Sequence, residues 1–386
     1  MKESFDIAIV GAGIVGAACA RECAAHGMKT AVIDAAGVGG GATAAGMGHI
    51  VVMDDSPAQM ELTRWSVELW RQLAPELPPQ AEFESRGTIW VAADEKEMAE
   101  VRRKQKLYAS AGIHTEMLDS DALAEAEPQL RLGLAGGLLV PSDAVLYPPC
   151  AADYLLQKAT EMGAWTATGN RVIAAGHGRV LLEDGTEVRA RTIVNACGAS
   201  APDLTPGLPV RKRRGHLVIT DRYPGFAHHQ LVELGYLKSA HSLTVDSVAF
   251  NVQPRQTGQL LIGSSREYGA ESKELNHALL DLMVRRAREY MPALGELQAI
   301  RVWTGFRAAT PDKLPLIGPW PEDESVFLAT GHEGLGITTS LATARLLLAS
   351  LTGERSAIAP QPYLPARFIS HRGIDRESEQ PEAAHG

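Results

Sequence analysis

Cysteine is scarce in this sequence of 386 residues, which contains only Cys19, Cys23, Cys150 and Cys197. The first two are spaced i, i+4 on an expected helix, and no second pair completes a zinc-binding pattern. Isolated cysteines of this kind are typical of small buried apolar residues in a reducing compartment. We therefore expect neither a disulfide framework nor a metal site.

An excess of positive charge is also missing. Lys and Arg number 37 against 46 Asp and Glu, which gives a formal net charge of −9. A protein without a broad basic field cannot neutralise a phosphate backbone, so nucleic acid is excluded as a partner. The one dense basic run, RKRRG at 211–215, is expected to be a solvated loop or a local anion contact.

Long hydrophobic runs are absent as well. No apolar stretch reaches the roughly 20 residues that a transmembrane helix requires, and a strand rather than a signal peptide is expected from Phe5. We therefore expect a cytoplasmic protein without an integral membrane segment, and peripheral attachment to the inner membrane stays open. The length favours two substructures rather than one core.

Glycine, in contrast, is abundant and clusters near the start of the chain. Gly11, Gly13 and Gly16 form GxGxxG between an apolar strand, DIAIV, and an alanine-rich helix. The first glycine permits the tight turn, the second admits a pyrophosphate, and the third lets the helix pack on the strand. Asp34 ends the next strand, where a carboxylate accepts ribose hydroxyls or simply caps the strand end. The pattern predicts a dinucleotide site at the helix N-terminus.

Three ordered motifs carry a family resemblance. IVGAGIVGAACA with VID and GGGATAAGMG, then RVWTGFRAATPDKLPLIGP, then VFLATGHEGLGITTSLATA resemble the FAD-dependent D-amino-acid oxidase family, glycine and sarcosine oxidase branch. The resemblance covers about residues 5–365. PSDAVLYPP and GHEGLGITTS are similar to its bacterial dehydrogenases, which include D-hydroxyproline dehydrogenase and the flavin subunits of opine and cyanide-forming dehydrogenases.

The resemblance implies an α/β fold, with a Rossmann-like (GR2-type) FAD-binding domain and an inserted α+β substrate domain on a mixed or antiparallel sheet. Local patterns agree: a helix is expected at 58–74, a strand at 87–93 and a charged surface helix at 94–112. EDGTEV at 183–188 is typical of a hairpin. The expected domains are 1–85, 145–214 and 305–368 for FAD, 86–144 and 215–304 for substrate, and 369–386 as a disordered tail.

The cofactor is expected to be non-covalent FAD, because members that tether flavin use a cysteine near the Arg307 motif and none follows Cys197. By resemblance, Thr43 reaches phosphate, Val172 meets adenine through its backbone, and a helix from Ile337 directs its positive end at the flavin. The expected FAD contacts are Gly11, Gly13, Ile14, Val15, Gly16, Asp34, Thr43, Ala44, Ala45, Gly46, Met47, Gly48, Val172, Ala196, Gly198, Arg307, Gly331, His332, Glu333, Gly334, Leu335, Gly336, Ile337 and Thr338.

Arg307 is the main substrate candidate. In glycine-oxidase-like enzymes, the arginine at this position holds the substrate carboxylate, since a guanidinium forms two parallel charge-assisted hydrogen bonds with it. The alternative is a structural ion pair with Asp312 or another acid.

Four further residues are either departures from close relatives or weaker candidates. Asn251 stands where relatives often have a tyrosine that also binds the carboxylate. Glu333 stands where some oxidases carry an arginine, and it is expected to accept from a substrate amine or hydroxyl or to face solvent. His49 is expected on the flavin face opposite the substrate, and His332 near the flavin edge; a packed or surface histidine is the alternative for each.

The expected reaction is oxidation of an amino-acid C–N bond, with hydride transfer from Cα to flavin N5 and an imine product. A D- or cyclic secondary amino acid such as cis-4-hydroxy-D-proline is the first hypothesis. The alternatives are a glycine or sarcosine-type oxidase that releases hydrogen peroxide, and an FAD subunit of a hetero-oligomeric amine or opine dehydrogenase. The electron acceptor (oxygen, a quinone or a partner subunit) and a homo- or hetero-oligomeric state stay open.

Overall fold

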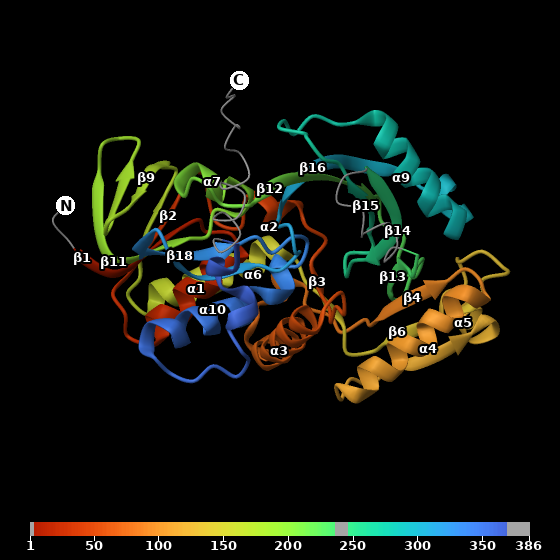
Figure 1. Cartoon of the computed structure of the whole chain (residues 1–386). Helices are drawn as coiled ribbons and strands as arrows, with labels where there is room; N and C mark the ends of the chain where they lie inside the picture. The colour runs from red at the N-terminus through yellow and green to blue at the C-terminus, as the bar shows by residue number, and fades with distance from the viewer. Residues whose placement is uncertain (1–3, 236–245, 369–386) are drawn as a thin grey trace, which may run out of the picture.

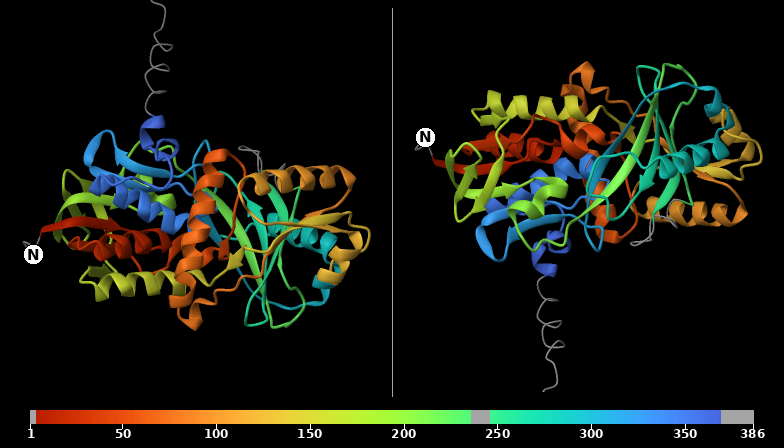
Figure 2. Two further views of the ribbon diagram at one scale, coloured as in Figure 1. Left: turned by 90° about the horizontal axis from the view of Figure 1, so that it is seen from below. Right: turned by 90° about the horizontal axis from the view of Figure 1, so that it is seen from above.

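A computed structural model describes residues 4–235 and 246–368, so the expected tail at 369–386 lies outside the described residues. Two large sheets dominate the described chain, and they form two lobes side by side (Figure 1). Helix α3 (Pro57–Leu73) lies between the lobes in both Figure 1 and Figure 2. The α/β class with a second, sheet-based substructure is therefore confirmed.

The first sheet contains the N-terminal strand at its centre. Its order is β17-β18-β11-β1-β2-β8, with the hairpin strands β9 and β10 attached to β11. The run from β18 to β8 is parallel, and DIAIV of β1 is covered on both faces, as parallel strands require. The strand bounds are β1 Ser4–Val10, β2 Thr30–Asp34, β8 Trp165–Thr168, β9 Val172–Gly176, β10 Arg179–Leu182, β11 Glu187–Asn195, β17 Leu316–Trp320 and β18 Asp323–Thr330.

Helices rich in small residues cover the first sheet. Helix α1 packs against both α6 and α10, and its buried positions are almost all Gly, Ala or Cys, which allow close approach. Cys19 and Cys23 are two of these buried positions, so their interpretation as small core residues is confirmed. The helix bounds are α1 Ile14–Ala25, α2 Gly41–Ala45, α6 Pro148–Glu161, α7 Ala201–Leu204 and α10 Gly336–Thr352.

The second sheet is mixed, as expected. Its order is β16-β12-β15-β14-β13-β4-β6-β5, and every neighbouring pair is antiparallel except β13 with β4. Helix α9 packs on β14 and β15, and α4 on β4 to β6. The bounds are β4 Thr88–Ala92, β5 Glu116–Asp119, β6 Gly136–Val140, β12 Arg211–Thr220, β13 Gln230–Glu233, β14 Ser247–Pro254, β15 Leu260–Arg266, β16 Ala299–Ala309, α4 Glu95–Ser110, α5 Ser120–Ala126 and α9 His277–Tyr290. A two-stranded sheet joins β3 (His49–Ile50) to β7 (Ala144–Val145).

Strands β12 and β16 arch from one lobe to the other (Figure 1) and pair along almost their whole length. The boundaries expected at 214/215 and 304/305 therefore fall inside these strands. The division into two domains stays a prediction.

The basic run at 211–215 begins strand β12 and is buried from Arg213 onward, so the alternative of a solvated loop was wrong. Arg213 and Arg214 in β12 are only 3% and 8% exposed. Arg214 donates two hydrogen bonds to the carboxylate of Glu267, at 2.8 and 2.9 Å. The run carries charge into the interior because acids far away in the sequence neutralise it.

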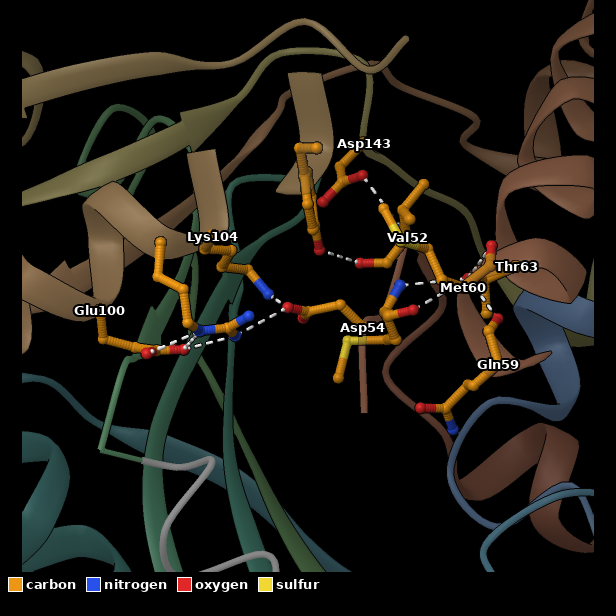
Figure 3. Close-up of polar contacts among 11 residues, drawn as sticks. Val52, Asp54, Gln59, Met60, Thr63, Glu100, Lys104 and Asp143 are labelled. Atoms are coloured by element: carbon orange, nitrogen blue, oxygen red, sulfur yellow. Dashed lines mark hydrogen bonds and ion pairs between the residues drawn. The ribbon is translucent and has the colours of Figure 1, made fainter. Parts of the chain in front are cut away.

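Helix α4 is a surface helix, as expected, but one of its charged residues, Lys104, is fully buried on the inner face. Its ammonium forms an ion pair with Asp54 (Figure 3). It also lies over the rings of Trp90 and Tyr108, 4.3 and 4.7 Å from their centroids. Burial lowers the pKa of Lys104, and the neighbouring carboxylate of Asp54 opposes that shift. The segment around Asp54 is thus anchored to α4, while Thr63 of α3 accepts a hydrogen bond from the Met53 N–H at 3.1 Å.

Candidate active site

The glycine loop has the geometry that its spacing predicts. Gly11 has φ +107°, and an added Cβ there would lie 2.6 Å from the Ala196 carbonyl oxygen. A Cβ on Gly16 would lie 1.8 Å from the Gly11 carbonyl oxygen. The turn and the packing of α1 on β1 therefore require glycine at both positions, and α1 presents its free N-terminal N–H groups beyond them.

Asp34 holds the loop in place from the end of β2. Its Oδ2 accepts from the Ala12 N–H at 2.7 Å, and its Oδ1 accepts from Ala36 and Gly37 at 2.8 and 3.1 Å. The strand-end cap is therefore present. A carboxylate offers about four acceptor positions, so capacity for a ribose hydroxyl remains and that contact stays a prediction.

Small residues at 44–48 let this segment lie against the start of α10 and against β16. A Cβ on Gly46 would meet the Ile337 side chain at 2.8 Å, and one on Gly48 would meet the Leu146 carbonyl oxygen at 1.9 Å. A Cβ on Gly305 of β16 would meet Ala45 at 2.4 Å. These packing contacts require small residues at 45, 46, 48 and 305, and with the glycine turn at 11–16 they fit the backbone-lined cradle that a dinucleotide needs.

Thr43 gives a direct test of the cofactor cradle. Its Oγ1 accepts from the Ile14 N–H at 3.0 Å, so the hydroxyl hydrogen is left to donate outward. We expect Thr43→Val to weaken FAD binding about 5- to 30-fold, because one lost buried hydrogen bond costs about 1–2 kcal/mol. Flavin fluorescence titration of the apoprotein measures this. Thr352→Val, at the far end of α10, is the matched control, and equal affinities in both variants would contradict the assignment.

One cavity lies between the two lobes and gathers the substrate candidates. His49, Asn251, Arg307 and Glu333 all line it, although they come from four separate elements. His332 does not: its Nε2 lies 3.0 Å from the Thr343 hydroxyl, and burial lowers its pKa to about 3. The remaining lining residues are Val51, Met53, Asp55, Gln59, Thr88, Trp90, Arg213, Gln230, Val232, Arg266, Lys313, Gly334 and Leu335.

Arg307 extends from β16 across the face of the neighbouring strands. Its Nη1 donates to the Ser265 carbonyl oxygen at 2.9 Å, and a Cβ on Gly215 would lie 2.4 Å from the same nitrogen. Asp312 pairs instead with Arg367, at 2.7 Å, so the alternative of an Arg307–Asp312 ion pair was wrong. The missing side chain at Gly215 leaves the guanidinium room to lie flat at the cavity wall.

Glu333 neither faces solvent nor stands alone in the cavity. It forms an ion pair with Arg213, which lies directly opposite Arg307 in the β12–β16 register. Its backbone adopts φ 55°, and its N–H donates to the Ala308 carbonyl oxygen at 2.9 Å. The alternative of a solvent-facing Glu333 was therefore wrong, and the other alternative, a contact with a substrate amine or hydroxyl, stays a prediction.

The cavity wall carries more positive than negative charge. Four cationic side chains line it against two acids, an excess of 4 − 2 = 2. The cations are Arg213, Arg266, Arg307 and Lys313, and the acids are Asp55 and Glu333. Sequence reasoning missed Arg213 as a site residue, although the buried basic strand was the signal that could have found it. The field favours an anionic substrate.

Titratable groups at the cavity are shifted by burial. Burial lowers the pKa of His49 to about 4, so the imidazole is neutral at pH 7, and its Nε2 has no hydrogen-bond partner among the described residues. Burial raises the pKa of Asp143 to about 7, while hydrogen bonding by Thr88 and by the Val52 N–H acts to lower it. The Val52 contact, at 3.3 Å, appears in Figure 3.

The site thus combines a glycine cradle for a dinucleotide with an adjacent cavity whose wall carries Arg307 and a net positive charge. This combination defines a nucleotide-dependent enzyme for anionic substrates. Residues 6–350 match the model of one family, described as FAD dependent oxidoreductase (DAO), and the chain belongs to this family. FAD is therefore its cofactor.

Relatives match over nearly the whole chain. Glycine oxidase from Pseudomonas aeruginosa is 26% identical over 93% of this chain and 98% of that protein. Hydrogen cyanide synthase subunit HcnC from the same organism is 26% identical over 95% and 97%. The crystal structure of glycine oxidase from Geobacillus kaustophilus has a TM-score of 0.85 at 25% identity, covering 95% of this chain and 99% of that one. These likenesses confirm the fold and the flavoenzyme class.

Metal clusters and membrane-spanning helices are both absent from residues 4–235 and 246–368. No group of three or more His, Cys, Asp or Glu side chains there could hold a metal ion. No helix in those ranges combines the length and apolar character needed to cross a bilayer.

Proposed function

We propose that this chain oxidises the C–N bond of an amino acid whose carboxylate binds Arg307. The observation that carries the proposal is the placement of that guanidinium at the wall of a net-positive cavity, beside the loop that begins α10. A carboxylate matches a planar guanidinium better than it matches the spherical charge of a lysine, since two hydrogen bonds fix its orientation.

The residues divide the task between binding and positioning. Arg307 would hold the carboxylate and so align Cα, and much of the rate would come from this alignment. Neutral His49 would add no positive charge beside the substrate amine, which reacts in its neutral form. FAD, when bound, supplies the hydride acceptor. No side chain needs to form a covalent bond with the substrate, which leaves as an imine.

The substrate is a finer proposal. A D- or cyclic secondary amino acid, such as cis-4-hydroxy-D-proline, is supported by Asn251 and the paired Glu333, which provide polar contacts beside the clamp. A glycine- or sarcosine-type oxidase is supported by the relatives named glycine oxidase. A flavin subunit in a hetero-oligomer is supported by the relative named as a hydrogen cyanide synthase subunit.

Anaerobic flavin reduction by a panel of glycine, sarcosine and D- and cyclic amino acids tests the proposal. We expect bleaching of the bound flavin by at least one amino acid and by none of the matching amines that lack a carboxylate. Peroxide release measured against dye reduction then separates an oxidase from a dehydrogenase. Reduction by amines alone would contradict the proposal, and turnover of glycine or sarcosine but not of D-proline analogues would favour the oxidase alternative.

A further inference from the structure

One wall of the cavity is a continuous face of the second sheet. Trp90 on β4, Val232 on β13 and Asn251 on β14 stand side by side, because Trp90 pairs with Val232 and Val232 pairs with Asn251. Gln230 lies two residues before Val232 and so shares its face. All four side chains line the cavity.

The side chains of Trp90, Gln230 and Asn251 are buried, and each has one polar group without a partner among the described residues. The groups are the Trp90 Nε1–H, the Gln230 Oε1 and the Asn251 Oδ1, on side chains that are 2%, 0% and 7% exposed. Gln230 is oriented by its own amide, whose Nε2 donates to the Ala144 carbonyl oxygen at 3.1 Å. Buried polar groups are normally paired, so three unpaired ones at a single cavity indicate a ligand.

The unpaired groups extend from Asn251, one strand from the carboxylate clamp, to Trp90, three strands away. The Arg307 guanidinium reaches β15, and Trp90 stands three strands further along, across β14 and β13 to β4. Three strand steps amount to at most ~14 Å. The N–Cα–C unit of an amino acid spans only about 3.5 Å. A ligand that touches both ends must therefore carry a sizeable side chain or N-substituent.

The chemistry of the three groups selects the end of that substituent. An indole N–H can only donate, and an amide oxygen can only accept. A carboxylate would satisfy Trp90 but repel the Gln230 oxygen, which is held in place because its amide nitrogen donates to Ala144. An ammonium would do the reverse. A hydroxyl or a carboxamide both donates and accepts, so either can satisfy all three residues.

We propose that Trp90, Gln230 and Asn251 form a second recognition site for a neutral hydroxyl or carboxamide group at the far end of the amino-acid substrate. This inference rests on the proposed function and deepens it by naming the substrate class. Trp90 is held for this role from behind, because the buried ammonium of Lys104 lies against its ring. Across the cavity, the Gln59 amide projects from α3 beside the Asp54 segment (Figure 3).

Four amino acids of similar length test the inference: D-glutamine, D-glutamate, D-ornithine and D-norvaline, compared by the rate and half-saturation of anaerobic flavin reduction. We expect D-glutamine to exceed the other three at least about tenfold, because a site built around hydrogen bonds rejects analogues that lack them. Trp90→Phe and Gln230→Met should each reduce the preference for D-glutamine over D-norvaline toward unity. Trp320→Phe, in a buried cluster outside the cavity wall, is the control for Trp90→Phe.

Every outcome bears on one of the two proposals. If D-norvaline or D-glutamate matches D-glutamine, or if the variants slow all four equally, the recognition site is refuted and the cavity end holds water only. Amino-acid oxidation itself would still stand in that case. If no amino acid of this or the wider panel reduces the flavin, the proposed function fails instead.

Discussion

Arg307→Lys should lower kcat/KM for an amino-acid substrate about 10- to 150-fold, because a hydrogen bond to a charged group contributes about 1.5–3 kcal/mol and the lysine loses one of two. The charge is retained, so any loss reports geometry. A lysine ammonium cannot form the parallel pair of bonds that aligns Cα, and it leaves the Ser265 carbonyl oxygen without its present donor. Stopped-flow flavin reduction separates weaker binding from slower hydride transfer.

Arg367→Lys is the matched control for this prediction, because Arg367 pairs with Asp312 and does not line the cavity. It should leave flavin reduction within about twofold, as expected for a substitution remote from the reacting groups. Flavin content should be normal in both variants. Unchanged reduction kinetics in Arg307→Lys would refute the carboxylate clamp.

Asp54→Asn should reduce the free energy of unfolding by about 3–5 kcal/mol, because it leaves the buried ammonium of Lys104 without its counter-charge. Asp54 and Lys104 are almost completely shielded from water, and the Trp90 and Tyr108 rings close the ammonium from the other sides. Urea unfolding of the FAD-bound protein, followed by tryptophan fluorescence, measures the change.

Two companion variants serve as controls for the Asp54→Asn prediction. Glu100→Gln removes an exposed partner of Arg103 and should cost less than about 1 kcal/mol. The double variant Asp54→Asn with Lys104→Met removes both buried charges and should recover most of the loss. A stability of Asp54→Asn equal to that of Glu100→Gln would show that Lys104 does not depend on the pair.

The nucleotide site could be predicted from the sequence because its determinants are local. Gly11 and Gly16 act within one strand–turn–helix unit, and their spacing follows from the turn and from helix packing alone. Arg307 was also predictable, since a charged residue in an otherwise apolar strand needs a partner inside the protein or from outside. Neither prediction depends on which strands are neighbours in the folded sheets.

The burial of Lys104 and Arg213 could not be predicted in this way. Both lie in charged stretches that are typical of solvated surfaces, and each is neutralised by an acid 50 or more positions away in the chain, Asp54 and Glu333. A charge can be buried only where the fold supplies its partner, and that partner is set by strand order and helix docking.

The family fold and the cofactor, together with the proposal of a carboxylate clamp, thus follow from short patterns in the chain. The far end of the cavity does not, because Trp90, Gln230 and Asn251 come from three strands that become neighbours only when the second sheet assembles. Side chains alternate between the two faces of a strand, so a shift of one residue in register would turn these groups away from the cavity. The proposed clamp at Arg307 would hold any amino-acid carboxylate. Which amino acid fits therefore depends on residues that only the tertiary structure brings together.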